Sequence, residues 1–354
     1  MFRIDHIIVD KATTPLVIPE IGACHDGSVS KAIKMIDEIE KAGARCVKFQ
    51  LYSPEELIAD RKRVVEWGAP NGKRVKETIG EMFQRLSIEK NDLKHLFEYA
   101  CSKGLVPFAT PFSMQGVDIL MELDVACFKI AASDVDHHPM LAHIAKTGKP
   151  VILSLGKCTL AEADEAISLL RDEGCTQLAI LHCVATYPSP MNDMNLNVIP
   201  TLINLYPECL VGFSDHSLGI IAPIAAVALG ARIIEKHVTL NKNAAGPDHW
   251  FSLNMEELKQ LIVSVEEVHS AMGHPRKQVL ACEQQGRTKA TRSLVANCFI
   301  PKGTIISEEH LKIVRPGHGI EPKHFSTVIG MAPQCDIEKN EVLTWNLFKM
   351  TVKL

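Results

Sequence analysis

Between residues 16 and 272 the sequence alternates short apolar runs with longer amphipathic segments, and this alternation constrains the fold more than any other feature. The amphipathic segments repeat apolar residues at helical spacing, as at Ala163, Ala166, Ile167 and Leu170. The eight apolar runs are residues 16–21, 46–49, 105–109, 126–131, 151–155, 178–183, 210–213 and 232–238. Eight strand–helix units predict an α/β fold with a parallel sheet, a (β/α)8 TIM barrel. A doubly wound open sheet is the alternative, but no GxGxxG motif follows the first run.

Changes in composition divide the chain into three parts. Residues 1–273 carry the barrel pattern, and residues 274–292 are polar and predict a linker. Residues 293–354 predict a small β-rich domain with strand-like pieces at 293–296, 303–306, 311–314 and 342–345. Within the barrel pattern, residues 52–85 are long for a connection and rich in Lys and Arg, which predicts a loop over the barrel mouth.

The charge and cysteine content limit the class of protein. The 354-residue chain has 38 Lys and Arg against 42 Asp and Glu, so it lacks the basic excess that a nucleic-acid or anionic-membrane partner requires. The longest apolar stretch, residues 218–231, is too short to cross a bilayer, and the N-terminus shows no secretory pattern. The 11 Cys are scattered without a CxxC pair, as expected of reduced thiols. We therefore expect a cytoplasmic enzyme that acts on small molecules.

Polar residues gather where the predicted strands end, which is where TIM-barrel active sites lie. Each alone could be a satisfied core group, but their recurrence at one end of most strands favours a shared pocket. The residues are Glu20, Lys48, Gln50, Thr110, Lys129, Ser154, Ser214, His216, Glu235 and His237.

Two chemistries follow from these residue types. His216 and His237 follow the last two strands, so they can bind one divalent ion, with a carboxylate of Glu20, Glu235 or Asp248 near them. Imidazole with carboxylate suits Mn, Fe, Co or Zn better than Ca. The two lysines and several hydroxyls favour an anionic substrate, most simply one that carries a phosphate and a carboxylate.

The segments around these residues resemble the sialic acid synthase family, which condenses phosphoenolpyruvate with an N-acetylated sugar. The matching segments are PEIGACHDG at 19–27, VKFQ at 47–50, ATPF at 109–112, FKI at 128–130, LHC at 181–183, YP at 187–188, GFSDH at 212–216, EKH at 235–237 and GPDH at 246–249. RPGHG at 315–319 resembles the family's C-terminal antifreeze-like (SAF) domain.

The resemblance implies a role for each residue. His216 and His237 would hold the metal, with Mn2+ favoured and Mg2+ or Co2+ as alternatives. Lys48 would face the carboxylate of phosphoenolpyruvate, with its phosphate bound by Thr110, Lys129, Ser154 and Ser214. The sugar would contact Gln50, Tyr187, Glu235, Asp248 and Arg315. The catalytic residues would be Glu20, Lys48, Lys129 and Asp134, with Asp134 near the reacting C2.

Several positions depart from the family pattern. Cys24 replaces an Asn, Ala132 lies where a hydroxyl-bearing residue is common, and Ala185 lies where an Asn is common. Lys157 replaces a Met, and we interpret it as a solvated side chain rather than a further anion contact. These changes leave the reaction class intact and the identity of the sugar open.

The resemblance also implies a domain-swapped homodimer, in which Arg315 reaches the barrel mouth of the partner. Two other functions remain open at this point. One is another phosphoenolpyruvate-using barrel synthase that makes a 3-deoxy-ulosonic acid. The other is a catalytically silent sugar-binding protein.

Overall fold

The computed structural model describes residues 2–69 and 74–348. Residues 274–292, expected as a linker, belong to the second of the two compact units into which the chain divides, residues 1–273 and residues 274–354. The predicted N-terminal boundary at residue 1 and the final residues 349–354 of the predicted small domain lie outside the described residues.

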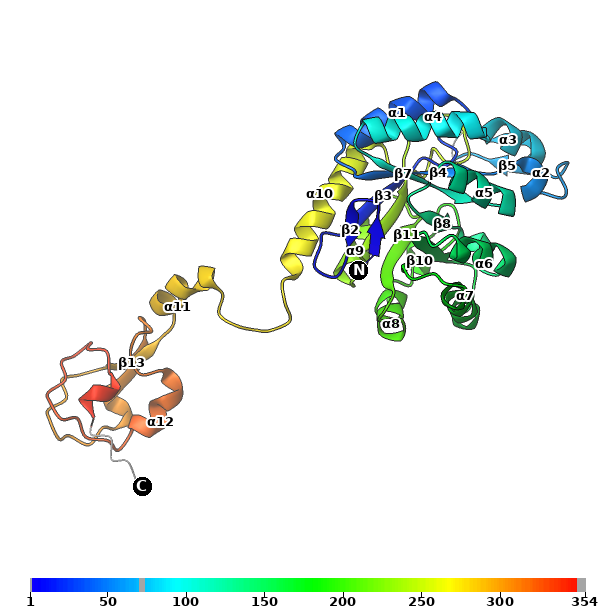
Figure 1. Cartoon of the computed structure of the whole chain (residues 1–354). Coiled ribbons are helices and arrows are strands. Elements are labelled where there is room, and N and C mark those ends of the chain that lie inside the picture. The colour runs from blue at the N-terminus through cyan, green and yellow to red at the C-terminus, as the bar shows by residue number, and fades with distance from the viewer. Residues whose placement is uncertain (1, 70–73, 349–354) are drawn as a thin grey trace. The chain divides into compact units, whose positions relative to one another are not determined.

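The first unit is a closed, parallel, eight-stranded barrel, which confirms the predicted TIM barrel (Figure 1). Its strands are β3 (Leu16–Glu20), β4 (Cys46–Leu51), β7 (Val106–Pro111), β8 (Phe128–Ile130), β9 (Val151–Leu155), β10 (Leu178–Cys183), β11 (Leu210–Asp215) and β12 (Ile233–His237). Pairing of β12 with β3 closes the barrel, so the polar ends of the first and last strands are neighbours.

Helices between the strands cover the outside of the barrel (Figure 1). They are α1 (Val29–Lys41), α4 (Lys90–Ser102), α5 (Met114–Glu122), α6 (His138–Lys146), α7 (Leu160–Asp172), α8 (Val198–Leu205), α9 (Ile221–Ala228) and α10 (Met255–Met272). Helix α7 shows how the sequence specifies them. Thr159 and Glu162 form a capping box at its start, and the predicted apolar stripe, which includes Ala166 and Leu170, is buried. None of the helices in residues 2–69 and 74–348 is long and apolar enough to span a membrane.

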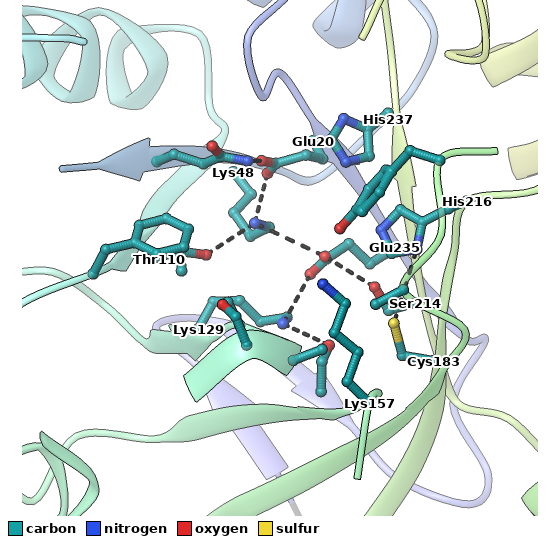
Figure 2. Close-up of a pocket in the computed structure, with 18 residues that line it drawn as sticks. Glu20, Lys48, Thr110, Lys129, Lys157, Cys183, Ser214, His216, Glu235 and His237 are labelled. Atoms are coloured by element: carbon teal, nitrogen blue, oxygen red, sulfur yellow. Dashed lines mark hydrogen bonds and ion pairs between the residues drawn. The ribbon is translucent and has the colours of Figure 1, made fainter. Parts of the chain in front are cut away.

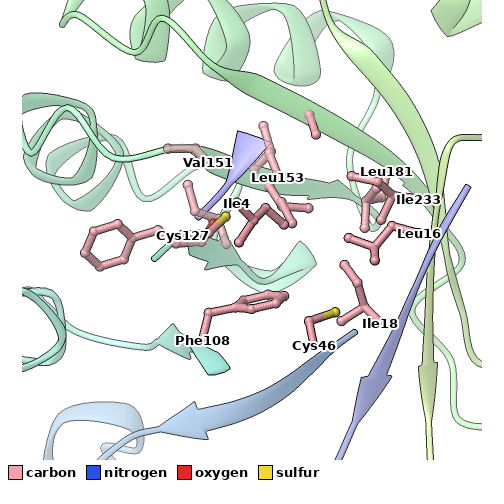
Figure 3. Close-up of a cluster of buried hydrophobic side chains, with 14 of the residues drawn as sticks. Ile4, Leu16, Ile18, Cys46, Phe108, Cys127, Val151, Leu153, Leu181 and Ile233 are labelled. Atoms are coloured by element: carbon pink, nitrogen blue, oxygen red, sulfur yellow. The ribbon is translucent and has the colours of Figure 1, made fainter. Parts of the chain in front are cut away.

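A hairpin that the sequence analysis did not predict closes the end of the barrel opposite the polar strand ends. Strands β1 (Phe2–Ile4) and β2 (Ile7–Val9) pair in antiparallel fashion, and their apolar side chains join the core of the barrel. Figure 3 shows Ile4 among interior side chains of several strands, including Ile18, Phe108 and Leu153. The apolar side chains of the hairpin therefore fill the interior of the barrel at its amino-terminal end.

The segment 52–85 is a folded insertion, so the prediction of a loop over the barrel mouth was wrong. It contains α2 (Pro54–Leu57), an antiparallel hairpin of β5 (Val64–Trp67) and β6 (Val75–Thr78), and α3 (Ile79–Leu86). The capping box of Thr78 and Glu81 starts α3, a local signal that was present in the sequence. None of the described residues in this segment lines the pocket at the strand ends.

The second unit has its own small core. It contains η3 (Ala281–Glu283), α11 (Gln284–Ala290), and the antiparallel pair of β13 (Ser293–Ala296) and β14 (Leu311–Val314). Two of the four predicted strand-like pieces are thus strands. Residues 303–306 are irregular, and residues 342–345 contribute only an isolated bridge, from Val342 to Val295. Short single turns, η4 (Glu308–His310), η5 (Pro322–His324), α12 (Phe325–Val328) and η6 (Trp345–Leu347), complete it.

Candidate active site

A polar pocket lies at the carboxyl ends of the barrel strands, where the sequence analysis expected it (Figure 2). Strand register explains why the side chains meet: His237 pairs with Glu20, and Glu20 pairs with Lys48, so neighbouring strands deliver them at one level. Eleven of the residues named from the sequence line it: Glu20, Lys48, Gln50, Thr110, Lys129, Ser154, Tyr187, Ser214, His216, Glu235 and His237.

One side of the pocket is formed by Lys48, Thr110, Lys129 and Ser154, which we call the cationic wall. The Lys48 ammonium lies 2.7 Å from a Glu20 oxygen and 3.0 Å from Thr110 Oγ1. The Lys129 ammonium lies 2.6 Å from Ser154 Oγ and donates to the Ile130 carbonyl at 2.8 Å. Both lysine side chains are almost fully buried, so their charges cannot be solvated by bulk water.

Two buried carboxylates balance these lysines. Glu235 lies between them, 3.8 Å from the Lys48 ammonium and 3.9 Å from that of Lys129, and accepts from Ser214 Oγ at 3.2 Å. Gln50 donates to Glu20 at 2.7 Å. The two carboxylates therefore compensate the charges of the two lysines. An anionic ligand would be an additional partner for both ammonium groups.

The pKa values reflect this balance. Burial lowers the pKa of Lys129, and the nearby Glu235 only partly opposes that effect. Burial also acts to lower the pKa of Lys48, but Glu20 and Glu235 outweigh it, so that pKa lies above its ordinary value. For Glu235 burial acts to raise the pKa, but Lys129 and Lys48 outweigh it and lower the value. Burial, assisted by the neighbouring Glu235, raises the pKa of Glu20.

The opposite side is formed by Tyr187, His216 and His237, which we call the imidazole wall. The two imidazole centroids are 5.5 Å apart, and the Tyr187 ring lies 4.3 Å from that of His216. His216 Nδ1 is 3.2 Å from the Val184 carbonyl, to which it donates in the neutral tautomer that leaves Nε2 with a lone pair. His237 Nδ1 is buried without a hydrogen-bond partner in the described part of the chain.

Both imidazoles are suited to a divalent cation. Burial lowers the pKa of His216 and that of His237 to about 3, so both are neutral near pH 7 and can act as ligands. The hydrogen bond from His216 to the Val184 carbonyl orients the imidazole ring, as such a bond does for histidines that bind metals. No group of three or more His, Cys, Asp or Glu in residues 2–69 and 74–348 is arranged as a ready ligand set. With two imidazoles as the protein ligands, the remaining positions around an ion would be left to water and substrate.

The approach of residues 22–23 to His237 depends on a glycine. Gly22 has φ +51, and a Cβ there would lie 2.7 Å from an Asp248 oxygen and 2.8 Å from His237 Nδ1. Only glycine combines this backbone conformation with so close a contact. The next residue, Ala23, donates its N–H to Asp248 at 2.9 Å, and Asp248 lies 3.5 Å from His237 Nδ1.

A buried ion pair on the other side of β12 holds the turn that carries His216. Glu235 and His237 face the pocket, so Lys236 between them faces outward, where its ammonium lies 2.5 Å from Asp215. Asp215 also accepts from the N–H of Ser217 at 2.8 Å, and Lys236 donates to the Ser217 carbonyl. This set of contacts fixes the backbone on both sides of His216.

Three predicted site residues do not line the pocket. Asp134 is half-buried at the end of η1 (Ala132–Asp134). Its neighbour Ser133 lines the pocket instead, and the Ser133 hydroxyl donates to the Asp134 carboxylate at 3.2 Å. Asp248 lies behind His237 and touches the site only through it and Ala23. Arg315 is an exposed residue of the second unit.

The pocket also contains residues that the sequence analysis did not place there: Phe112, Ala131, Ala132, Ser133, Lys157, Cys183 and Ala185. Lys157 is the one that carries charge: it lines the pocket and is also exposed to solvent, so its interpretation as a solvated side chain stays a prediction. Cys183, at the end of β10, has its sulfur 3.8 Å from His216 Nδ1.

A TIM barrel whose strand ends converge on buried lysines, carboxylates and imidazoles has the architecture of an enzyme active site. Comparison with known proteins identifies the group. The NeuB family pattern matches residues 35–277 and the SAF domain pattern matches residues 291–349. The chain belongs to the NeuB family and carries a C-terminal SAF domain.

Individual relatives extend over nearly the whole chain. An uncharacterised protein of Methanocaldococcus jannaschii is 37% identical over 338 residues, 96% of each chain. The N,N'-diacetyllegionaminic acid synthase of Campylobacter jejuni is 34% identical over 330 residues, 93% of this chain and 98% of that one. The crystal structure of a sialic acid synthetase from Leptospira borgpetersenii in complex with citrate superposes with a TM-score of 0.73 at 32% identity, covering 80% of this chain and 94% of that one.

Proposed function

We propose that this protein condenses phosphoenolpyruvate with an N-acetylated hexose and water, giving a nonulosonic acid and phosphate. One observation carries the proposal: two buried lysines that can bind an anion face two neutral imidazoles that can bind a cation, across one pocket. The names of relatives from Campylobacter jejuni and Leptospira borgpetersenii support the same reaction class.

The cationic wall binds phosphoenolpyruvate. Lys48 pairs with its carboxylate, and Lys129 pairs with its phosphate, to which Thr110, Ser154 and Ser214 donate hydroxyl hydrogen bonds. These hydroxyls already lie within 3.2 Å of a lysine or of Glu235, so the donors are in place before the ligand arrives. A preorganised set of donors stabilises the departing phosphate without reorganisation.

In the imidazole wall, His216 and His237 would hold a divalent ion next to the aldehyde of the sugar. Such an ion, with Mn2+ first and Mg2+ or Co2+ as alternatives, would supply Lewis acidity to the aldehyde oxygen. Gln50, Tyr187 and Glu235 position the sugar from around this ion, and Asp248 holds His237 and the backbone of Ala23 in place.

The bond changes follow from this placement. C3 of phosphoenolpyruvate attacks the aldehyde carbon, water adds at C2, and the tetrahedral intermediate expels phosphate by C–O cleavage. A carboxylate near C2 must accept the proton of the water. Asp134, which the resemblance places near C2, does not line the pocket, whereas the predicted catalytic residue Glu20 does, so we assign the proton to Glu20.

An assay of phosphate release with different acceptor sugars tests the proposed reaction and identifies the acceptor. Phosphate release from phosphoenolpyruvate is followed with Mn2+ and a panel of N-acetylmannosamine, its 6-phosphate, diacetamido-trideoxyhexoses and, for comparison, an aldose phosphate that lacks an N-acetyl group. Release with one of these sugars supports the proposal. Release only with an aldose phosphate that lacks an N-acetyl group would indicate a 3-deoxy-ulosonic acid synthase, and no release with any acceptor would indicate a silent sugar-binding protein.

We further propose that the protein acts as a domain-swapped homodimer in the cytoplasm, in which Arg315 contacts the acceptor at the barrel of the partner. Arg315 directly follows β14 and its side chain is exposed, so it is free to reach a ligand.

A further inference from the structure

Lys157 lies at the pocket in an unusual backbone conformation. It lines the pocket although its residue is exposed at the mouth, and its backbone has φ +56. In Figure 2 its side chain extends from the loop after β9 into the pocket. A left-handed conformation is unfavourable for a residue with a long side chain, and such residues persist where the surroundings or a function require them.

The loop that carries Lys157 is fixed by the residue before it. A Cβ on Gly156 would lie 2.9 Å from the Ala132 Cβ and 3.1 Å from the Cys183 sulfur. Gly156 therefore packs closely against Ala132 of η1 and Cys183 at the end of β10, with no room for a side chain. Ser154, the partner of Lys129, lies three residues before Lys157 on the same chain segment. This places Lys157 beside the phosphate end of the proposed substrate site.

The electrostatics of the pocket leave Lys157 without a carboxylate. Lys48 and Lys129 each have Glu20 or Glu235 within 4 Å, whereas Lys157 has no ion-pair partner in the described parts of the chain. Three lysines thus line the pocket against two glutamates. The neighbouring lining positions Ala132 and Ala185 offer no polar side chain, so among the described residues the other side-chain donors near the loop are the neutral hydroxyls of Ser133 and Ser154.

We propose that Lys157 binds the phosphate group of phosphoenolpyruvate from the mouth of the pocket, as a third cation beside Lys48 and Lys129. This inference rests on the proposed function and specifies which residue adds affinity for the anionic substrate. An ammonium on a flexible stem suits a phosphate that must leave after C–O cleavage, because it can follow the ion toward solvent.

The test replaces Lys157 by an uncharged side chain of similar length. Lys157→Met should raise both the Kd for phosphoenolpyruvate, measured by calorimetry without sugar, and its KM about 10-fold, while the KM for the sugar stays unchanged. The KM of the wild type should rise with salt concentration more steeply than that of the variant, because an exposed charge is screened. Lys34→Met, at an exposed lysine of α1 away from the pocket, is the matched control and should change neither constant.

A second variant separates function from folding. Lys157→Gly removes the charge at a position whose φ favours glycine, so its Tm should equal or exceed that of the wild type while its affinity for phosphoenolpyruvate falls as in Lys157→Met. Unchanged affinity in both variants would overturn the inference. A raised KM confined to a phosphorylated sugar would also overturn it, because the phosphate bound would then be that of the acceptor. A wild-type protein that binds no phosphoenolpyruvate would instead contradict the proposed function itself.

Discussion

The two walls of the pocket differ in how they are prepared for a ligand. The cationic wall contains charges that are already compensated, since Lys48 and Lys129 lie within 4 Å of Glu20 or Glu235. The imidazole wall contains neutral rings with unused lone pairs, and His237 Nδ1 has no hydrogen-bond partner within the described residues. The charges of one wall are therefore balanced by protein groups, whereas the lone pairs of the other are suited to a cation. Variants of each wall should accordingly fail in different ways.

Removal of an imidazole should have the largest effect. His216→Ala or His237→Ala should lower kcat about 1000-fold or more, since Lewis-acid activation of the aldehyde contributes several kcal/mol. Binding of phosphoenolpyruvate without sugar, measured by calorimetry, should change little because the cationic wall is intact. A chelator should abolish wild-type turnover, and Mn2+ should restore it. Full turnover by a metal-stripped enzyme in chelator would show that the imidazole wall has another role.

Removal of a lysine should affect substrate affinity before turnover. Lys129→Met or Lys48→Met should raise the KM for phosphoenolpyruvate about 10- to 100-fold, the effect of losing one charge-assisted contact of about 1.5–3 kcal/mol. Lys48→Met leaves the buried Glu20 without its lysine partner, and Lys129→Met removes one of the two lysine partners of Glu235, so the free energy of unfolding should be measured in parallel. The double variant Lys129→Met with Glu235→Gln should recover stability but not affinity. An unchanged KM in both single lysine variants would mean that the lysines only hold the carboxylates.

A drop in pH should lower the free energy of unfolding, because the fold holds buried histidines neutral. His25 is buried beside the imidazole wall, its Nδ1 accepts from the N–H of Gly27 at 2.9 Å, and burial lowers its pKa to about 4. An unfolded histidine titrates near pH 6.5, so the unfolded state takes up the proton first as the pH falls. The free energy of unfolding should therefore fall between pH 6.5 and pH 4.5, with His25 contributing up to about 2.5 kcal/mol.

Urea unfolding at several pH values measures this dependence. His25→Gln keeps an acceptor for the N–H of Gly27 but does not titrate, so its stability should depend less steeply on pH than that of the wild type. If the free energy of unfolding of the two proteins changed with pH by the same amount, His25 would not be held neutral in the folded state.

Arg315 should give the smallest effect, because it would add one exposed contact to a site built elsewhere. Arg315→Ala should raise the KM for the sugar about 3- to 10-fold and leave that for phosphoenolpyruvate unchanged. A mixture of Arg315→Ala and His216→Ala subunits should recover part of the activity after subunit exchange. Absence of recovery in confirmed mixed dimers would show that the barrel receives no Arg315 from a partner.

The sequence predicted the barrel well because its signal is strong and repeated. The runs at 151–155 and 178–183 coincide with β9 and β10, and the others differ by one or two residues at an end. Buried parallel strands are continuous apolar runs, so they stand out against the amphipathic helices. The β1–β2 hairpin was missed because strands of three residues are too short to show a period.

The site was predictable at strand ends and less so in loops. Residues on strands, such as Lys48, Lys129 and Glu235, are placed by the barrel geometry alone. Asp134 and Lys157 follow their strands, where the direction of the backbone decides which side chain enters the pocket. At Ala132–Asp134 a helical turn brings Ser133 to the pocket in place of Asp134. At Lys157 a positive φ brings the side chain to the pocket, and no residue pattern reports that angle.

The position of the β1–β2 hairpin affects how the chain folds during translation. Residues 2–9 are synthesised before the barrel strands, yet their apolar side chains belong to the same core as β12, and the N–H of Arg3 donates to Gln177. Those partners emerge from the ribosome long after the hairpin has done so. The nascent chain therefore carries an exposed apolar N-terminal segment until most of the barrel is translated. Such a segment is a target for chaperones, and a fusion joined to it would delay the last step of barrel closure.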